Sequence, residues 1–271
     1  MKLVVVGGVA GGASAAARVR RLDAKAQIVM FERGEHVSFS NCCLPYYLSG
    51  TVATSDALVL MTPEKFHAQH DIDARVNTEV IEIKRAEKKV VARNLATGET
   101  YEESYDKLVL APGANPILPR SIAGIDRANV FAVRNVTDIV KLKEYVSAAG
   151  IEKVAVVGGG FIGIETAENL KEAGKQVCVI EGTNQIMAPF DYDMVQILHK
   201  ELDDHGVQLY LSTTLTAVED GCVKVQREGK EESIPADAVV MAIGVAPETT
   251  LAKAAGLEIG ETRGIKVNHN F

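Results

Sequence analysis

Short continuous runs of apolar, mostly β-branched residues recur along the chain, and they predict parallel strands that are covered on both faces. They lie at residues 2–6, 27–32, 105–110, 154–157, 177–181 and 238–243. The first and fourth runs are each followed by a glycine-rich turn and then by a predicted helix, at residues 13–22 and 164–173. Strands that alternate with helices in this way predict an α/β fold.

A second pattern lies between these units. Residues 78–84, 89–94 and 99–105 alternate between apolar and polar positions, so they predict a small antiparallel meander. Another meander is expected between residues 181 and 238, and residues 264–267 have the pattern of a last strand. A helix is predicted at 62–66, with Thr62 as its N-cap and Pro63 at its first position. The proline-rich stretch 111–119 predicts a crossover between domains.

The first glycine-rich turn begins a dinucleotide-binding pattern. It reads Gly7-Gly8-Val9-Ala10-Gly11-Gly12, and the strand after its helix ends in the acid Glu32. Glycines let the backbone approach a pyrophosphate at the helix N-terminus, and the acid accepts hydrogen bonds from ribose hydroxyls. Val9 stands where the motif has its second glycine, and we expect Gly8 and Gly11 to allow the same close approach.

The second turn, Gly158-Gly159-Gly160-Phe161-Ile162-Gly163, matches the G-x-G-x-x-G motif in full. The strand that follows ends in Glu181, 18 residues after Gly163. An acid there hydrogen-bonds the ribose 2′-hydroxyl and repels a 2′-phosphate, so NADH is predicted in preference to NADPH. Two such units in one chain suggest a flavin and a nicotinamide with a hydride passing between them.

Two of the four cysteines, Cys42 and Cys43, are adjacent and precede a predicted short helix at residues 44–49. Free N–H groups and the dipole at a helix N-terminus favour an anion, so a thiol held there becomes a better nucleophile. The alternative is that both are ordinary packed cysteines. We interpret Cys178, in the middle of a strand, as a core residue, and Cys222 lies in a predicted hairpin.

Composition narrows the possible partners. The chain has 271 residues, enough for one large or two medium domains, and a formal net charge of −7 with a pI near 5.5. Because it has no basic tract, neither nucleic acid nor an anionic membrane surface is an expected partner. No apolar run approaches a membrane span and no secretory signal is recognised, so four cysteines indicate reduced thiols in a cytoplasm. No metal site is predicted.

These motifs resemble those of the two-dinucleotide-binding-domain flavoproteins, which have the glutathione-reductase-like fold. The segments that carry the resemblance are Gly7 to Gly12, Arg18-Val-Arg-Arg21, Phe31-Glu-Arg33, Ser38-Phe-Ser-Asn-Cys42 with Leu44-Pro-Tyr46, Thr62-Pro-Glu-Lys-Phe66, the second glycine motif and Gly244-Val-Ala-Pro247. They are similar to the coenzyme A-disulfide reductase and NADH-dependent persulfide reductase branch.

The resemblance implies two Rossmann-like three-layer domains, each with a small antiparallel β meander. An FAD-binding domain is expected at residues 1–116, to which 245–271 return, and an NAD(H)-binding domain at 117–244. The family continues into a second flavin motif and a dimerisation domain that are absent here. The chain is therefore expected to be part of a longer, homodimeric enzyme.

The resemblance also implies roles for single residues. Cys42 is the redox cysteine, placed against the flavin. Glu165 holds the nicotinamide amide, and Phe161 covers the flavin until NADH displaces it. The positions that hold coenzyme A or the sulfur substrate are Ser14, Arg18, Arg21, Ser38, Asn41 and His70, the last often a lysine in the family. The other implied cofactor contacts are Gly7, Gly8, Val9, Ala10, Gly11, Glu32, Arg33, Val80, Ala111, Gly113, Gly158, Gly160, Ile162, Gly163, Glu181 and Gly244.

Cys43 departs from the family, which has a small residue after the redox cysteine. We interpret it as a small space-filling residue. The alternative is a second thiol that resolves a mixed disulfide on Cys42, although adjacent cysteines close only a strained ring that is easily reduced.

The main hypothesis is an FAD-dependent NAD(P)H oxidoreductase that reduces coenzyme A disulfide, a persulfide or a polysulfide through Cys42. A second hypothesis is an NADH oxidase or peroxidase that forms a cysteine sulfenic acid. In that branch a histidine occupies the first glycine turn, where this chain has Ala10. A third is a truncated, inactive nucleotide-binding or thiol redox-sensing module.

Overall fold

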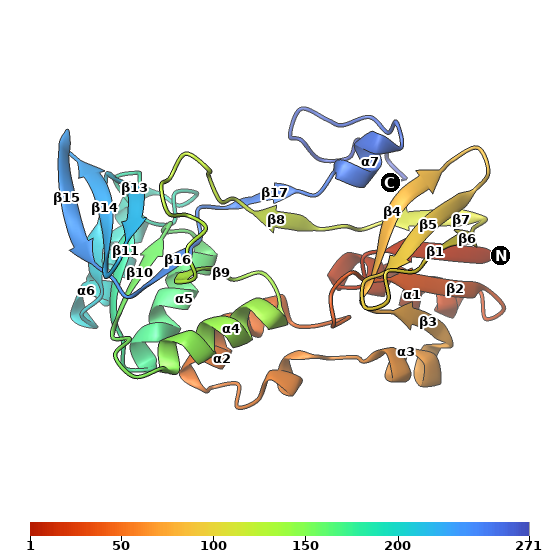
Figure 1. Cartoon of the computed structure of the whole chain (residues 1–271), viewed down its shortest axis with the longest axis horizontal. Coiled ribbons are helices and arrows are strands. Elements are labelled where there is room, and N and C mark those ends of the chain that lie inside the picture. The colour runs from red at the N-terminus through yellow and green to blue at the C-terminus, as the bar shows by residue number, and fades with distance from the viewer. Residues whose placement is uncertain (271) are drawn as a thin grey trace. The chain divides into compact units, whose positions relative to one another are not determined.

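The computed structural model describes residues 1–270, and its contacts divide the chain into two compact units. Figure 1 labels most of their elements. The first unit holds Met1–Ser40, Val59–Asn115 and the stretch that begins at Ala246; the second holds Asn41–Leu58 and Pro116–Val245. The cysteine-bearing segment Asn41–Leu58 therefore packs with the second unit, although in sequence it lies inside the stretch expected to bind FAD.

Four parallel strands form the central sheet of the first unit, in the order β3-β2-β1-β7. They are β1 (Lys2–Val6), β2 (Gln27–Phe31), β3 (Ile72–Arg75) and β7 (Lys107–Leu110). Leu3 and Val5 pack with the helices α1 (Ala10–Leu22) and α3 (Pro63–His70), whereas Val4 and Val6 pack with an antiparallel meander. The apolar run of β1 is continuous because layers cover both of its faces.

The meander of the first unit comprises β4 (Thr78–Lys84), β5 (Lys89–Asn94) and β6 (Thr100–Ser104), and it confirms the predicted pattern. Thr62 is the N-cap of α3, as predicted, because its hydroxyl accepts a hydrogen bond from Lys65 N at 3.3 Å.

The second unit repeats this architecture around five parallel strands in the order β12-β11-β10-β16-β9. They are β9 (Val130–Ala132), β10 (Lys153–Val157), β11 (Gln176–Ile180), β12 (Gln208–Tyr210) and β16 (Ala238–Met241). The helices are α4 (Val136–Ser147), α5 (Phe161–Glu172) and α6 (Tyr192–Asp204), and the meander is β13 (Thr213–Glu219), β14 (Cys222–Arg227) and β15 (Lys230–Pro235).

Cys178 is a core residue of the second unit, as predicted. It lies with Ala155 and Val157 in the cluster that packs the sheet against the meander, and it is 6% exposed. Burial raises the pKa of its thiol to about 12, so this cysteine stays protonated and unreactive.

The remaining elements are short. The 3₁₀ turn η1 (Asn41–Cys43) leads into α2 (Leu44–Ser49), which is the predicted helix, and η2 (Ser55–Leu58) follows. The strands β8 (Ala114–Pro116) and β17 (Val245–Pro247) pair with each other, and α7 (Thr250–Ala254) comes after them.

Two predictions about elements need correction. Residues 264–267 form no strand: Ile265 makes a single bridge to Ile259, because Arg263 turns the chain with a φ of 65° and no strand within residues 1–270 pairs with this exposed segment. Helices α1 and α5 begin at Ala10 and Phe161, three residues earlier than predicted, because the end of each glycine motif already forms the first helical turn. None of the helices within residues 1–270 has the length and apolar character needed to cross a bilayer.

Candidate functional site

The turn between β1 and α1 is closed by contacts between its own glycines. A Cβ added to Gly12 would lie 1.8 Å from the carbonyl oxygen of Gly7. Gly7 itself has a φ of +98°, and a Cβ there would lie 2.0 Å from the oxygen of Ala111. Gly12 is therefore the third glycine of the motif, which the predicted set of cofactor contacts omits.

The turn between β10 and α5 has the same construction. A Cβ added to Gly163 would lie 1.9 Å from the oxygen of Gly158. One added to Gly160 would meet none of the described atoms within 4 Å. Gly160 thus faces open space at the start of α5, where the backbone can approach a pyrophosphate. In the first turn the corresponding residue is the half-buried Val9.

One N–H of each glycine turn and one N–H two residues after the acid together hold the acid that ends the next strand. The carboxylate of Glu32 accepts from Gly8 N and from Gly34 N, both at 2.8 Å. The carboxylate of Glu181 accepts from Gly159 N at 2.7 Å and from Thr183 N at 2.8 Å. Both oxygens of Glu32 keep a second lone pair for a ribose hydroxyl, whereas in Glu181 only Oε2 does, because Oε1 also accepts from the Thr183 hydroxyl at 2.9 Å. The two turns thus fit two dinucleotides, because both combine close backbone packing with an oriented acid.

Ser38 is tied directly to the first turn. Its N–H donates to the carbonyl oxygen of Gly8 at 2.9 Å, and its own carbonyl accepts from Leu60 N at 2.9 Å. Its φ of 48° is left-handed, which a serine adopts at a cost in backbone energy, and such strained residues cluster at functional sites. Arg33 lies nearby in sequence and donates to the side chain of Asn115 at 3.0 Å.

Helix α1 carries three arginines, of which one holds the end of α3 and two have no partner within residues 1–270. Arg20 donates to the carbonyl oxygens of His70 and Asp71, both at 2.7 Å, and so caps the C-terminus of α3. Arg18 and Arg21 are exposed, and neither has a hydrogen bond or ion pair within residues 1–270. Two unpaired guanidinium groups on one helix are suited to an anionic, phosphate-rich ligand.

His70 is the last residue of α3, and its ring lies 6.1 Å from that of Phe66. The expected substrate residues are divided between the units: Ser14, Arg18, Arg21, Ser38 and His70 lie in the first unit, and Asn41 lies in the second with Cys42 and Cys43.

The cysteine turn, η1 (Asn41–Cys43), carries two free thiols. All four cysteines are free thiols; Cys42 is exposed, and Cys43 is half-buried at the N-cap position of α2. Gly50 ends this helix with a φ of 87°. The charges of Glu165 and Glu168 raise the pKa of Tyr46, which places the side of α2 that bears Tyr46 near the acidic surface of α5.

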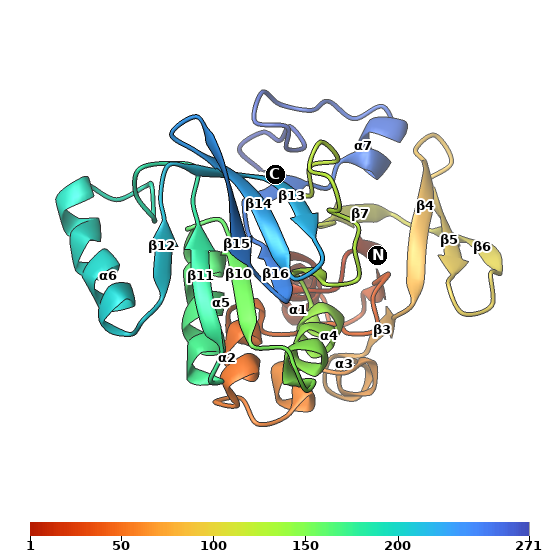
Figure 2. The ribbon, with the colours of Figure 1, turned by 60° about the vertical axis from the view of Figure 1, so that its left-hand side comes forward.

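Helix α2 packs against α5 and α4 (Figure 2). The hydroxyl of Ser49 donates to the side-chain oxygen of Asn169 at 2.7 Å. The ammonium of Lys143 donates to the carbonyl oxygen of Tyr47 at 2.6 Å and lies 4.0 Å from the centre of the Tyr47 ring. Neither Asn169 nor Lys143 belongs to a motif, so no sequence signal indicates their role.

Two residues of α5 have properties that suit a site. Burial, and then the charge of Glu168, raise the pKa of Glu165. Phe161 is 59% exposed, and its ring packs edge-on against that of Phe190 at 6.1 Å. Ile162 is also exposed. An exposed aromatic ring at the start of the helix that follows the second glycine turn is not a core residue, which leaves it free to contact a ligand.

Three of the other predicted cofactor positions, Ala111, Gly113 and Gly244, lie at or next to the ends of strands, and the fourth, Val80, lies inside β4. Ala111 N donates to Val6 O at 2.8 Å, and Gly113 O accepts from Glu248 N at 2.9 Å. Gly244 has a φ of +118°, and its oxygen accepts from Ile117 N at 3.0 Å. Val80 is buried beside a bulge in β4.

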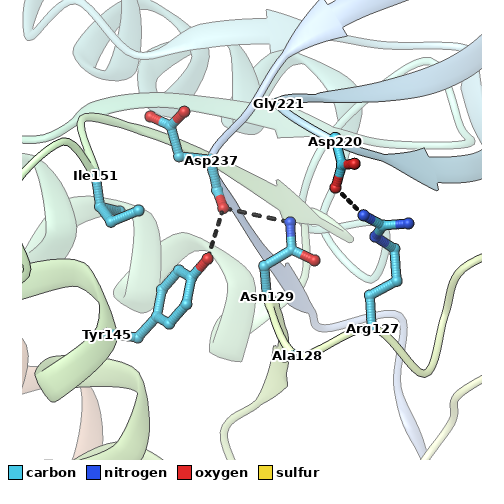
Figure 3. Close-up of a pocket in the computed structure, with 8 residues that line it drawn as sticks. All are labelled: Arg127, Ala128, Asn129, Tyr145, Ile151, Asp220, Gly221 and Asp237. Atoms are coloured by element: carbon cyan, nitrogen blue, oxygen red, sulfur yellow. Dashed lines mark hydrogen bonds and ion pairs between the residues drawn. The ribbon is translucent and has the colours of Figure 1, made fainter.

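A shallow pocket in the second unit contains none of the predicted site residues (Figure 3). Its polar groups are satisfied internally. The carbonyl oxygen of Asp237 accepts from Asn129 at 3.3 Å and from Tyr145 at 3.4 Å, and Arg127 pairs with Asp220.

Known proteins share this arrangement. The coenzyme A disulfide reductase of Staphylococcus aureus (strain JH9) is 34% identical over 270 residues, which cover 100% of this chain and 60% of that protein. The crystal structure of reduced Bacillus anthracis CoADR-RHD matches with a TM-score of 0.96 at 44% identity and covers 100% of this chain and 48% of that one.

The NAD-dependent persulfide reductase of A. fulgidus matches with a TM-score of 0.93 at 36% identity, over 99% of this chain and 50% of that one. The chain thus spans about half to three fifths of the length of the relatives it matches. The sequence matches the family described as pyridine nucleotide-disulphide oxidoreductase over residues 1–271. The chain belongs to this family.

Proposed function

We propose that the protein is the nucleotide-binding and thiol-bearing part of a flavin-dependent oxidoreductase that reduces coenzyme A disulfide, a persulfide or a polysulfide through Cys42. The observation that carries this proposal is the packing of the cysteine helix α2 on α5, the helix that begins at the second glycine motif. The segment that bears Cys42 and the second glycine turn thus belong to one compact unit.

The cofactors are assigned from the two turns. The first unit, with Gly7 to Gly12 and Glu32, would hold FAD, and the second, with Gly158 to Gly163 and Glu181, would hold NAD(H). When bound, the flavin accepts hydride from the nicotinamide and supplies two electrons to a sulfur centre. Glu181 favours NADH over NADPH, since its carboxylate accepts from the 2′-hydroxyl and repels a 2′-phosphate.

Cys42 would carry the sulfur chemistry. Its thiolate attacks one sulfur of the substrate disulfide, forms a mixed disulfide and releases the other half as a thiolate. Two electrons then cleave the mixed disulfide and release the second thiol. Exposure of Cys42 at the start of α2 leaves its sulfur accessible to a small disulfide. Cys43, half-buried at the N-cap, fills space beside it.

The named relatives support the substrate class, since two of them are called coenzyme A disulfide reductase and NAD-dependent persulfide reductase. Arg18 and Arg21 add support, because unpaired arginines suit the phosphates of coenzyme A. The full-length protein would be a homodimer.

The test is turnover of NADH by the flavin-loaded protein with coenzyme A disulfide, oxygen and peroxide in parallel. The proposal predicts that disulfide is the preferred acceptor, and that Cys42→Ser abolishes its reduction. It also predicts that electron transfer from NADH to flavin persists in this variant. Full disulfide reductase activity of Cys42→Ser would overturn the assignment of the thiol, and a purified protein that binds no flavin would favour a nucleotide-binding or redox-sensing module.

A second candidate is an NADH oxidase or peroxidase. A structural similarity favours this candidate. The structure of the water-forming NADH oxidase of Lactobacillus brevis bound to NADH matches with a TM-score of 0.87 at 30% identity, over 97% of this chain and 57% of that one. Ala10 counts against it, because it offers no acid-base group in the first turn. A higher turnover with oxygen or peroxide than with disulfide would establish this alternative.

A further inference from the structure

Asn169 is a buried polar residue of α5 whose two side-chain groups face different partners. It is 1% exposed. Its Nδ2 donates to the carbonyl oxygen of Glu165, one turn earlier in the same helix, at 2.8 Å. Its Oδ1 accepts from the hydroxyl of Ser49 at 2.7 Å. Because its own helix binds the amide nitrogen, the oxygen is fixed in orientation toward α2.

Ser49 is the last residue of α2, so this bond reaches the helix that Cys43 begins and Cys42 precedes. The serine hydroxyl has a single proton. Asn169 Oδ1, at 2.7 Å, is a shorter acceptor than Tyr46 O, at 3.2 Å, and Thr51 lies at 3.0 Å as a donor to Ser49. The hydroxyl therefore links α2 to α5 rather than capping its own helix.

A helix of six residues is unstable by itself, because forming its first turn fixes several residues for few hydrogen bonds. Its position must come from the elements that hold it. Leu44 and Leu48 are buried, and two polar contacts near the C-terminus of α2 fix it further: the Ser49 to Asn169 bond on α5, and Lys143 on α4, which binds the Tyr47 carbonyl and ring. Only the first of these connects α2 to the helix that carries Glu165.

We propose that Asn169 is a positioning residue that fixes the cysteine turn on the nicotinamide-binding helix, so that Cys42 keeps the orientation that disulfide reduction requires. The inference rests on the proposed function of Cys42. Asn169 acts through Ser49 and α2 and touches neither substrate nor cofactor. Loss of the link loosens α2 at its C-terminus, while the turn at Gly158 to Gly163 stays intact.

The test compares Ser49→Ala, Asn169→Ala and the double variant in the flavin-loaded protein. Thr166→Val is the matched control, because Thr166 is also buried in α5 and binds a carbonyl of its own helix, Ile162 O at 2.6 Å. Three quantities are measured: NADH-dependent reduction of coenzyme A disulfide, NADH-dependent reduction of ferricyanide, and amide hydrogen exchange of the peptide that covers α2.

The proposal predicts that both single variants lower disulfide turnover about fivefold, the size expected for one lost hydrogen bond, and leave ferricyanide turnover unchanged. Exchange in α2 should become faster, and the double variant should be no worse than Asn169→Ala. Thr166→Val should change none of these. Ser49→Ala removes only a hydroxyl, so this variant tests the positioning role if Asn169→Ala does not fold.

Disulfide and ferricyanide turnover that fall together would overturn the proposal, because that is the result of general loss of structure. Additive effects of the two single variants would also overturn it. If the wild-type protein reduces no disulfide, the proposed function fails separately, and unchanged exchange of α2 in both single variants then overturns the positioning role.

Discussion

The two glycine turns are built on one plan and differ at one position. In both, a Cβ on the last glycine, Gly12 or Gly163, would collide with the carbonyl of the first. In both, the N–H of the second residue binds the acid at the end of the next strand. The difference lies between them, where Val9 in the first turn corresponds to Gly160 in the second.

This difference shows that a turn can require glycine for two different reasons. Gly12 and Gly163 are required by the protein's own backbone, since the obstructing atoms are carbonyl oxygens of the same turn. Gly160 has no such neighbour among the described residues, so any requirement for glycine there must come from a ligand. A valine at that place in the first turn therefore leaves the fold intact and changes only what the turn can hold.

The largest effect is expected at the glycines that the backbone requires. Gly12→Val and Gly163→Val would each force a carbonyl oxygen away from a Cβ placed within 2 Å of it, so each should destabilise its unit by about 3 kcal/mol or more. Urea unfolding followed by circular dichroism measures this. Gly160→Ala is the control. An equal midpoint of urea unfolding for Gly163→Val and Gly160→Ala would contradict the claim that the backbone requires glycine only at position 163.

The next effect concerns Gly160 itself. Gly160→Val gives the second turn a valine, the residue that the first turn has as Val9. The backbone can accept a valine there, because the φ of Gly160 is −80°. We expect unchanged stability and at least about a tenfold loss of NADH affinity, because the side chain occupies the space for the pyrophosphate. Titration calorimetry with NADH measures the affinity. Unaltered NADH binding would show that the second turn does not hold the nicotinamide dinucleotide.

The acids allow a paired test of which turn binds which cofactor. Glu181→Gln places an amide group opposite two N–H donors, so it should weaken NADH binding about tenfold and reduce the preference over NADPH. Glu32→Gln should instead lower the amount of flavin that copurifies with the protein. Both quantities are measured on both variants. The same pattern of losses in the two variants would contradict the assignment of separate cofactors.

The smallest effect is the pH dependence of Glu165. Burial raises the pKa of this carboxyl in the folded protein, so the folded state binds its proton more tightly than the unfolded state. Stability therefore falls as pH rises from the unfolded pKa through the folded one. Glu165→Gln should raise Tm by about a degree or two at about pH 7 and leave it unchanged at about pH 3.5, where both states are protonated. An equal increase in Tm at both pH values would show that ionisation of Glu165 is not the cause.

Much of the fold follows from local patterns. The strands β1, β4 and β5 begin and end where apolar runs and alternation predict, and α2 extends over the predicted Leu44–Ser49. These elements are set by periodicity and by turn residues that act on their neighbours. The two glycine motifs are recognisable for the same reason, although Gly12 is recognised as the counterpart of Gly163 only when the two turns are compared.

Long-range packing could not be predicted in this way. Three arginines of α1 look alike in sequence, yet within residues 1–270 only Arg20 reaches the end of α3, whereas Arg18 and Arg21 have no partner there. Likewise, nothing near Asn169 indicates that it binds Ser49, 120 residues away. Such partners depend on how the elements pack, and a local pattern carries no information about that.

The central claim is that electrons from NADH, bound at the second turn, reach Cys42. Anaerobic titration of the flavin-loaded protein with NADH, after oxidation of the thiol by coenzyme A disulfide, tests it most directly. The wild-type protein and Cys43→Ser should consume about one equivalent of NADH more than Cys42→Ser before the flavin absorbance is lost, because only they carry a reducible disulfide on Cys42. Equal consumption by wild type and Cys42→Ser would contradict the account.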